Sequence, residues 1–488
     1  MERYITYEQF GAVGDGVADD MPAIVRAHDE ANRLDLPVVA KEGATYLVSH
    51  KKATATVMTS TCWSGASFVI DDRDCEDIHA PVFNVTSTKQ PVPLSISSLK
   101  RGQTRIDNPT GQRLYVIVKD RGHLDYIRFG LNQNNGTARA DNFIVCEDGT
   151  LSSAVSFDFD NITDVIATPM DSTPLTIKGG TFTTIANQAE SRYTYHARNI
   201  VIHRSCVEVS DITHLVTGEL DHGAPYTGFI SIVGCAEVTV HDCVFTGHYI
   251  YSTIGNAGKP VMMGSYDINC SSASSVTFRS CSQTTDIMDK RYWGLIGSNF
   301  CRDLVFEDCR FSRFDAHMGV SNCTLRRCTL GWQCLNAIGN GTFLIEDTTA
   351  YGYAFVNLRE DFGSSWRGDM IIKNCTWHPL GESRSIFSAS NDGHHFFGYD
   401  CYITENVTID GFEIAEDSPD DRPLFIFNDY AKNAADRATP YPPIPPLSVK
   451  VSNIRTDRPI LLCQRPSLMP TTTFSIGAAE PPDDHRRS

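Results

Sequence analysis

Short runs of alternating apolar and polar residues recur along the chain, each closed by a polar residue and then Cys or Thr. The clearest lie between residues 276 and 375 and read VTFRSC, LVFEDC, TLRRC, LIEDT and MIIKNC. Alternation with period two predicts β-strands with one buried face. The closing residues recur at intervals of roughly 20 to 30 residues and are Cys281, Cys309, Cys328, Thr348 and Cys375.

A repeat of this length cannot bury its inner face alone, so neighbouring repeats must stack and share one core. The pattern therefore predicts a parallel β-helix. A free Cys at the closing position behaves as a small buried hydrophobe. We expect unpaired inward thiols, because side chains stacked in parallel are wrongly oriented for an unstrained disulfide. This prediction covers Cys243 and the four closing cysteines above.

The first residues predict a helix that closes one end of the stack. Residues 5–34 read ITYEQFGAVGDGVADDMPAIVRAHDEANRL, in which Asp19 or Asp20 can cap a helix and Pro22 suits its first turn. One apolar face follows, formed by Ile24, Ala27, Ala31 and Leu34. Asp15, Asp19 and Asp20 are interpreted as turn and capping residues. An amphipathic helix here would cover the apolar end that a terminal repeat leaves open.

The segment FGAVGDGVADD followed by a helix resembles the opening of the pectate-lyase-like superfamily. That group of right-handed parallel β-helix proteins includes polygalacturonases, polysaccharide lyases, fructotransferases and phage tailspike depolymerases. The resemblance implies an all-β fold and a carbohydrate substrate. The polygalacturonase motifs NTD, DD, GHG and RIK do not occur in order, so no catalytic residue is carried over from that family.

Three regions follow from the pattern. Residues 1–50 form the N-terminal cap and first rung, 51–415 the parallel β-helix, and 416–488 a C-terminal extension with the Pro-rich segment YPPIPPL and a frayed end. Between about 40 and 200 the repeats are weaker, and the polar loop at 130–142 is expected to project from the stack.

Charge narrows the choice of partners. The 488 residues carry a formal net charge of −17, which disfavours nucleic acid and anionic membranes. No apolar run is long enough to span a bilayer.

The opening MERYITYEQF lacks signal-peptide features and the sixteen Cys favour a reducing compartment, so we expect a cytoplasmic protein, or a secreted one if a leader was removed. No cofactor is expected. Solenoids can pack side by side as a homotrimer or homodimer.

Polar residues at the same point of successive repeats indicate where a ligand binds. Counting back from the closing residues brings Asp315 and Asp361 near one another, with one repeat between them. Alternation places Arg313, Asp315 and His317 on one face, and it places Asn357, Arg359 and Asp361 on the corresponding face of a later strand. Glu360 falls with the apolar set unless the strand turns there.

Two carboxylates separated by one rung would stand roughly 9.5 Å apart, within the spacing of inverting glycosidases. Asp315 and Asp361 are therefore the predicted acid and base, assisted by His317, with Arg359 holding a substrate oxygen. Glu360 is a further candidate, since a partly buried carboxyl can act as a general acid. The competing interpretation is that Arg313 with Asp315, and Arg359 with Asp361, are exposed ion pairs of little consequence.

Further residues are predicted to contact the sugar. Tyr292 and Trp293 form an apolar platform, Arg313 lies beside the carboxylates, and Trp366 and Arg367 close the cleft from the other side. A second cluster in the loop at 217–229 is expected to line one end of the cleft and contains Glu219, Asp221 and His222. A metal site that adds His214 is disfavoured by irregular ligand spacing.

Three functions remain open at this stage. The first is a glycoside hydrolase or transglycosylase with paired carboxylates. The second is a polysaccharide lyase that acts on a uronic-acid polymer, for which Arg313, His317, Arg359 and Tyr292 supply a cation and a base. The third is a non-catalytic, tailspike-like carbohydrate-binding module.

Overall fold

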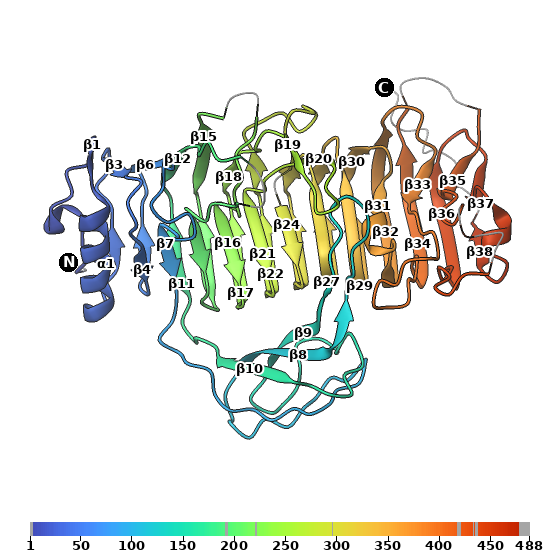
Figure 1. Ribbon diagram of the computed structural model, residues 1–488, viewed down its shortest axis with the longest axis horizontal. Helices are drawn as coiled ribbons and strands as arrows, with labels where there is room; N and C mark the ends of the chain where they lie inside the picture. The colour runs from blue at the N-terminus through green and yellow to red at the C-terminus, as the bar shows by residue number, and fades with distance from the viewer. Residues whose placement is uncertain are drawn as a thin grey trace, which may run out of the picture.

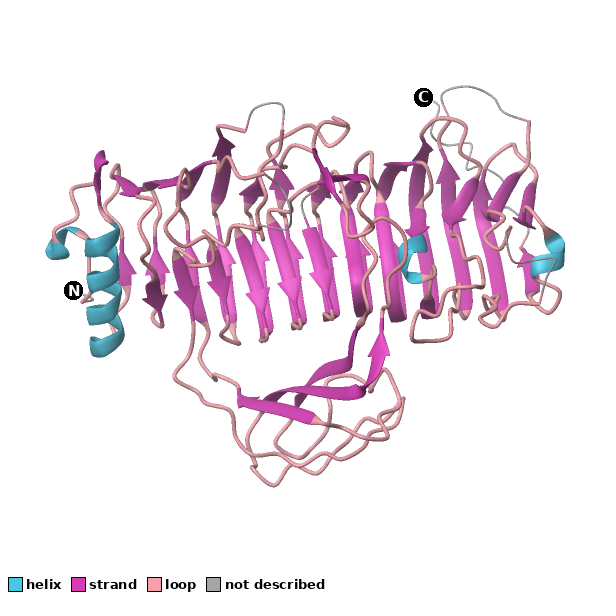
Figure 2. Ribbon diagram, in the orientation of Figure 1, coloured by secondary structure: helices cyan, strands magenta, loops and turns pink. Residues whose placement is uncertain are grey.

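The computed structural model describes residues 3–190, 194–219, 222–294, 296–416, 421–432, 434 and 438–477. These residues form a right-handed parallel β-helix, which confirms the predicted fold class. Each turn of the chain contributes strands to three parallel sheets that run along the long axis of the molecule (Figure 1). Figure 2 shows that strands dominate and that helix is confined to short segments.

The first sheet begins at the N-terminal cap. Its strands pair in parallel in the order β1 (Asp15–Asp19), β3 (Thr45–Val48), β6 (Ser67–Asp71), β12 (Thr181–Ile185), β15 (Thr213–Thr217), β18 (Val244–Phe245), β23 (Ser282–Gln283), β26 (Arg310–Phe311), β28 (Thr329–Leu330), β30 (Thr349–Gly352) and the end of β32 (Trp366–Pro379).

The second sheet contains the alternating apolar and polar runs that precede the closing Cys and Thr residues. Its order is β2 (Val38–Val39), β5 (Thr61–Cys62), β11 (Leu175–Lys178), β14 (Val207–Ser210), β17 (Ala236–His241), β22 (Ser274–Arg279), β25 (Arg302–Glu307), the second halves of β27 (Phe314–Arg326) and β29 (Leu335–Glu346), then β32, β34 (Asn406–Ile414), β36 (Ser448–Arg455) and β38 (Thr473–Ile476).

The third sheet carries the candidate site and is called the floor sheet below. It consists of β4 (Ala55–Val57), β7 (Phe83–Val85), β13 (Ile200–Ile202), β16 (Ile230–Val233), β21 (Ile268–Ser271), β24 (Ile296–Asn299), the first residues of β27 and β29, β31 (Val356–Leu358), β33 (Ser385–Ser388), β35 (Leu424–Phe427) and β37 (Ile460–Cys463). Because β27 and β29 bend round a corner, each serves two sheets.

The repeated closing phrase marks one corner of the helix. The polar residue before each closing Cys or Thr has a positive φ, for example 52° at Ser280, 54° at Asp308 and 50° at Asn374. Asp and Asn tolerate this left-handed conformation better than most residues. The residue that follows turns inward, so the closing side chains are almost fully buried, as predicted. All sixteen cysteines are free in the structure.

The helix α1 (Met21–Leu34) covers the open end of the stack, as predicted (Figure 1). Ile24, Ala27 and Ala31 are buried, whereas Leu34 is exposed. Asp20 does not cap α1 with its side chain. Its carboxylate instead accepts hydrogen bonds from the backbone N–H groups of Val13 and Gly14, and so fixes the glycine-rich turn. The short helix η1 (Glu8–Phe10) precedes this turn.

The weak repeats between 40 and 200 have one main cause, a unit inserted between β7 and β11. Its antiparallel sheet consists of β8 (Leu114–Asp125), β9 (Thr137–Val145) and β10 (Asp164–Pro169). A separate core that includes Leu114, Val116 and Phe143 stabilises it. The inserted unit hangs below the stack in Figure 1, and the segment at 126–136 returns to the β-helix. The predicted projecting loop belongs to this unit.

The stack does not end at residue 415. Strand β36 pairs with β34, and β38 pairs with β36, because Val449 and Val451 continue the inward apolar row. The boundary predicted between 415 and 416 thus falls inside the stack. The Pro-rich segment at 441–447 is a connection within it, and η3 (Pro466–Leu468) lies close to its end. The predicted frayed end at 480–488 lies outside the described residues. None of the helices described here is long and apolar enough to cross a membrane.

Candidate active site

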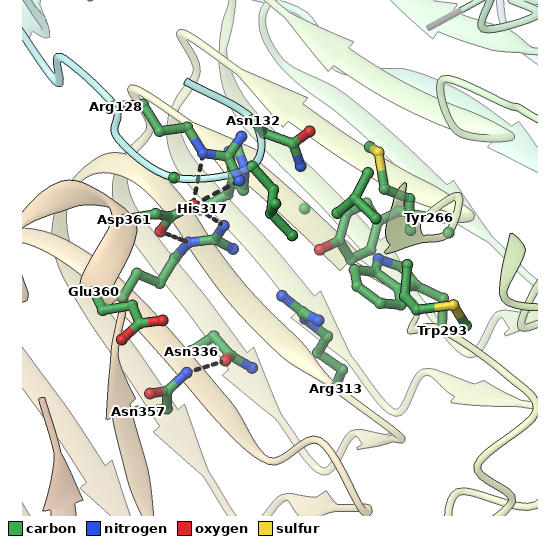
Figure 3. A pocket seen from close by; sticks show the side chains of 18 of the residues that line it. Arg128, Asn132, Tyr266, Trp293, Arg313, His317, Asn336, Asn357, Glu360 and Asp361 are labelled. Carbon is green, nitrogen blue, oxygen red and sulfur yellow. Dashed lines mark hydrogen bonds and ion pairs between the residues drawn. The ribbon is translucent and has the colours of Figure 1, made fainter. Parts of the chain in front are cut away.

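A cleft of about 970 Å³ lies on the outward face of the floor sheet. Its lining includes side chains from β24, β27, β29 and β31, together with Tyr226, Tyr266 and residues 128–132 of the inserted unit. Figure 3 shows Tyr266, Trp293 and Arg313 on one side of the cleft, and Arg128, Asp361 and Glu360 on the other. Arg313, His317, Arg359 and Asp361, which the sequence analysis singled out, line this cleft.

Strand register sets the polar floor of the cleft. Gly297, Asp315, Asn336, Asn357 and Ser388 occupy one row across five neighbouring strands. Asn357 donates a hydrogen bond from Nδ2 to Oδ1 of Asn336 at 2.7 Å. The partner of Asp315 two rungs along is therefore Asn357. The sequence analysis predicted Asp361 at this position, which is four residues further along the chain than Asn357.

Asp315 is fully buried beneath the cleft, so the expectation of an exposed carboxylate is wrong. Its Oδ2 accepts hydrogen bonds from Tyr266 at 2.7 Å, Arg313 at 2.6 Å and Arg359 at 2.8 Å. Burial alone raises the pKa of Asp315, but Arg313 and Arg359 outweigh it and hold the pKa well below its usual range. A carboxylate in this state anchors its neighbours and is not free to exchange a proton with substrate.

Asp361 lies in the short helix η2 (Glu360–Phe362), where the predicted strand has already ended. It accepts hydrogen bonds from Arg359, with Nη2 to Oδ2 at 3.1 Å, and from Arg128, with Nε to Oδ2 at 2.6 Å. Burial favours a higher pKa for Asp361, yet the charges of Arg359 and Arg128 lower it. The strand turns after Leu358, so Glu360 points to solvent at the edge of the cleft instead of joining the apolar set.

These contacts form one chain of alternating charge in the order Arg313, Asp315, Arg359, Asp361 and Arg128. Three guanidinium groups face two carboxylates, which leaves one net positive charge. Four of these five residues were predicted as a cluster, but Arg128 was not. No local pattern could identify it, because it comes from the inserted unit more than 180 residues earlier in the sequence.

His317 lies in the cleft beside this chain of charges. Burial, reinforced by the charge of Arg359, lowers the pKa of His317 to about 3, so the imidazole is neutral at physiological pH. Nδ1 lies 2.7 Å from Oδ1 of Asn299. A neutral ring facing this oxygen carries its hydrogen on Nδ1 and keeps a lone pair on Nε2. His317 therefore offers an unprotonated nitrogen to a group bound in the cleft.

The aromatic wall of the cleft depends on two glycines. A Cβ at Gly297 would lie 2.9 Å from the Tyr266 ring, and one at Gly264 would lie 2.2 Å from Cβ of Trp293. The Arg313 guanidinium carbon lies 4.5 Å from the centroid of the Trp293 ring, a cation–π contact. Trp293 thus lines the cleft as predicted. Tyr266, which the sequence analysis missed, holds the hydroxyl that binds Asp315.

Three other predicted sugar contacts lie elsewhere. Tyr292 stacks on Tyr249, with ring centroids 4.8 Å apart, and does not line the cleft. Trp366 is fully buried in the core, where Nε1 donates to the carbonyl oxygen of Gly341. It opens β32, so alternation turns it inward. Arg367, its outward neighbour, pairs with Glu405 away from the cleft.

The second predicted cluster is a buried ion network rather than a wall of the cleft. His248 lies 3.0 Å from Glu219 and 3.3 Å from Asp267, and His214 lies 2.8 Å from Asp267. Burial lowers the pKa of His248, but Glu219 and Asp267 raise it to about 10. The ring of His248 stacks on Tyr226, which does line the cleft. The network supports the cleft from behind.

The remaining members of that cluster lie apart from the network. His222 packs near Tyr251, beside a separate depression bordered by Ser252 and Pro260. Asp221 lies outside the described residues. No group of three or more His, Cys, Asp or Glu side chains is arranged to hold a metal ion in the described part of the chain.

Comparison with known proteins gives structural matches alone. No family model and no curated protein matches the sequence. The tailspike gp61 of Pseudomonas phage phi297 has a similar structure, with a TM-score of 0.58, 11% identity, and coverage of 97% of this chain and 84% of the tailspike. The gp54 tailspike of Acinetobacter baumannii bacteriophage AP22, solved in complex with a capsular saccharide, has a TM-score of 0.50 and 9% identity, with coverage of 97% and 79%. The chain therefore has the right-handed parallel β-helix fold of pectate-lyase-like proteins, as the segment FGAVGDGVADD predicts.

Proposed function

We propose that the protein is a carbohydrate-active enzyme that cleaves an acidic polysaccharide in this cleft by β-elimination. Glu360 lies at the edge of the cleft, outside the chain of hydrogen-bonded charges. The observation that carries the proposal is that chain, whose three arginines exceed its two aspartates by one positive charge in a protein with a formal net charge of −17. The carboxylate of a uronic acid would balance it, and Arg is the side chain best suited to bind a carboxylate. The saccharide bound to the AP22 tailspike supports a saccharide ligand.

Elimination needs a cation at the carboxylate and a base at the neighbouring carbon. With the substrate carboxylate held by the arginines, Nε2 of His317 takes the proton from C5. The electron pair of that C–H bond forms the C4–C5 double bond, and the C4–O bond breaks with its electrons on the leaving oxygen. The proton held by His317 then passes to this oxygen. His317 is neutral and already oriented by Asn299, so Nε2 is unprotonated when the substrate binds. The negative charge of the bound uronate then favours uptake of the proton by this ring.

Hydrolysis is the second candidate, and Glu360 is the observation that favours it. Glu360 is an exposed carboxylate at the edge of the cleft, adjacent to Asp361. The pair predicted from sequence, Asp315 with Asp361, fits hydrolysis poorly because Asp315 is buried and bound by three donors. In a hydrolase at this site, Glu360 would take the role expected for Asp315.

Product chemistry tests the proposal directly. Acidic and neutral polysaccharides are incubated with the protein, and both ultraviolet absorbance and reducing ends are measured. Elimination predicts one unsaturated, absorbing end for each new reducing end, and no reaction after the carboxyl groups of the polymer are reduced to alcohols. Reducing ends without absorbance would indicate hydrolysis, and an intact polymer that still binds would indicate a binding module.

A further inference from the structure

The inserted unit and a hairpin of the β-helix meet above the floor sheet. The hairpin consists of β19 (Tyr251–Ile254) and β20 (Pro260–Met263) and lies between β18 of the first sheet and β21 of the floor sheet. Residues 128–133 of the inserted unit and 255–257 of the hairpin are called the arch below. Figure 1 shows the segment at 126–136 rising from the inserted unit across the strands of the stack toward the hairpin.

One end of the arch is fixed at the edge where strands leave the floor sheet. Tyr126 packs with Ile338 and Phe362 at that edge. The backbone N–H of Phe129 donates to the carbonyl oxygen of Asp361 at 3.1 Å, and the Phe129 ring stacks on His395 with centroids 4.4 Å apart. The arch is thereby tied to the same helix η2 that carries the acidic residues of the site.

The other end is fixed to the hairpin at the opposite edge, where the floor strands begin. The N–H of Ala257 donates to the carbonyl oxygen of Leu131 at 3.0 Å, and Nδ2 of Asn256 donates to the carbonyl oxygen of Gln133 at 3.0 Å. A Cβ at Gly255 would lie 2.3 Å from the Leu131 oxygen, so this approach requires a glycine. Two segments far apart in sequence thus span the width of the floor sheet.

The cleft extends to both sides of the arch along the stack. Tyr226 and Asn269 line it at the level of β16 and β21, and Ser388 and Asn428 line it at the level of β33 and β35. Leu131 and Asn132 of the arch line the same cleft between these levels. A chain that occupied the full cleft would pass beneath the arch.

We infer that the arch makes the cleft a covered passage, so that a saccharide chain enters end first and is shortened from an end. This inference rests on the proposed function of the cleft, since it assigns a mode of action to the same site. An open groove would admit the middle of a long chain, but an arch of two hydrogen-bonded segments above the floor excludes that approach. The substrate class is therefore a linear acidic polysaccharide with an accessible end.

The test compares free polymer with the same polymer coupled to beads through both ends. The wild-type protein should cut the end-blocked polymer at least 10-fold more slowly, and should release short products from free polymer while viscosity falls slowly. Gly255→Val, whose side chain collides with the Leu131 carbonyl and parts the arch, should restore cleavage of end-blocked polymer. Ser252→Ala on the same hairpin is the matched control and should behave as wild type.

Equal rates on free and end-blocked polymer would overturn the inference while leaving the proposed function intact. If no polymer is cut, the proposed function fails. Binding of free and end-blocked polymer to the immobilised protein then tests the covered passage. Free polymer should then be retained more strongly than end-blocked polymer, and equal retention would contradict the covered passage. Folding of Gly255→Val is checked by its thermal transition. If that variant does not fold, Asn256→Ala, which removes one contact of the arch, takes its place.

Discussion

The guanidinium group of Arg359 lies 2.8 Å from Oδ2 of Asp315, so an arginine neutralises a buried carboxylate two rungs away. This contact changes the interpretation of the role of Asp315. A residue that the sequence pattern marks as a proton donor or acceptor is a structural anchor for the two arginines that face the cleft.

Asp315→Asn should destabilise the protein strongly. The substitution leaves Arg313 and Arg359 without a buried counter-charge, and breaking a buried pair in this way costs about 3–5 kcal/mol. Urea unfolding followed by circular dichroism measures the loss. Asp289→Asn, which removes the partly exposed partner of the exposed Arg291, is the control and should change stability little. Equal stability of the two variants would contradict the anchoring role.

His317→Ala should reduce turnover by a factor of about 10²–10⁴, the usual contribution of a positioned base. Glu360→Gln should retain most activity under elimination. Because the pKa of His317 is lowered to about 3, turnover should show no loss near pH 6.5, where an ordinary histidine takes up its proton. Measurement of kcat from pH 5 to 8 checks this. A fall in kcat with a midpoint near pH 6.5, or loss of activity in Glu360→Gln alone, would count against His317 as the base.

Arg128→Gln should weaken binding of acidic polysaccharide. A charge-assisted hydrogen bond contributes about 1.5–3 kcal/mol, so KM should rise by roughly 10- to 100-fold. Arg121→Gln is the matched control on the same inserted unit, since Arg121 pairs with Asp164 at an exposed position away from the cleft. Binding of carboxyl-reduced polymer should be the same in both variants. An unchanged KM in Arg128→Gln would remove Arg128 from the binding site.

Gly297→Ala should displace Tyr266 from Asp315. The added Cβ would lie 2.9 Å from the Tyr266 ring, and overpacking of this kind costs about 1–3 kcal/mol. We expect lower activity and a lower midpoint of thermal unfolding. The double variant Gly297→Ala with Tyr266→Phe, which no longer has a hydroxyl to place, should lose little more than Tyr266→Phe alone. Full additivity of the two effects would contradict the coupling.

His248 should make the fold sensitive to alkaline pH. Its pKa is raised to about 10 from the usual 6.5 by Glu219 and Asp267, so the folded protein holds a proton that the unfolded chain releases. This contribution to stability is fully present below pH 6.5 and is lost as pH rises toward about 10. Urea unfolding of wild type and His248→Gln at pH 6, 8 and 10 should show the gap between them narrowing. A constant gap would exclude the charged state of His248.

The sequence by itself determined the fold. Alternation along each strand, the positive-φ residue before each closing Cys and the helix α1 are local features, and a solenoid is built from contacts between neighbouring repeats. For the same reason the sequence placed Arg313, His317, Arg359 and Asp361 at one height of the stack.

The tertiary structure decided which of those side chains are free to act. Asp315 is buried because Tyr266, Arg313 and Arg359 cover it. The position of a residue along its strand does not predict which side chains will cover it. Strand register placed Asn357 in the row of Asp315, and β31 ends at Leu358, before Asp361. Arg128 and the arch come from an insertion whose attachment is set by long-range packing, which no local pattern of hydrophobic and polar residues encodes.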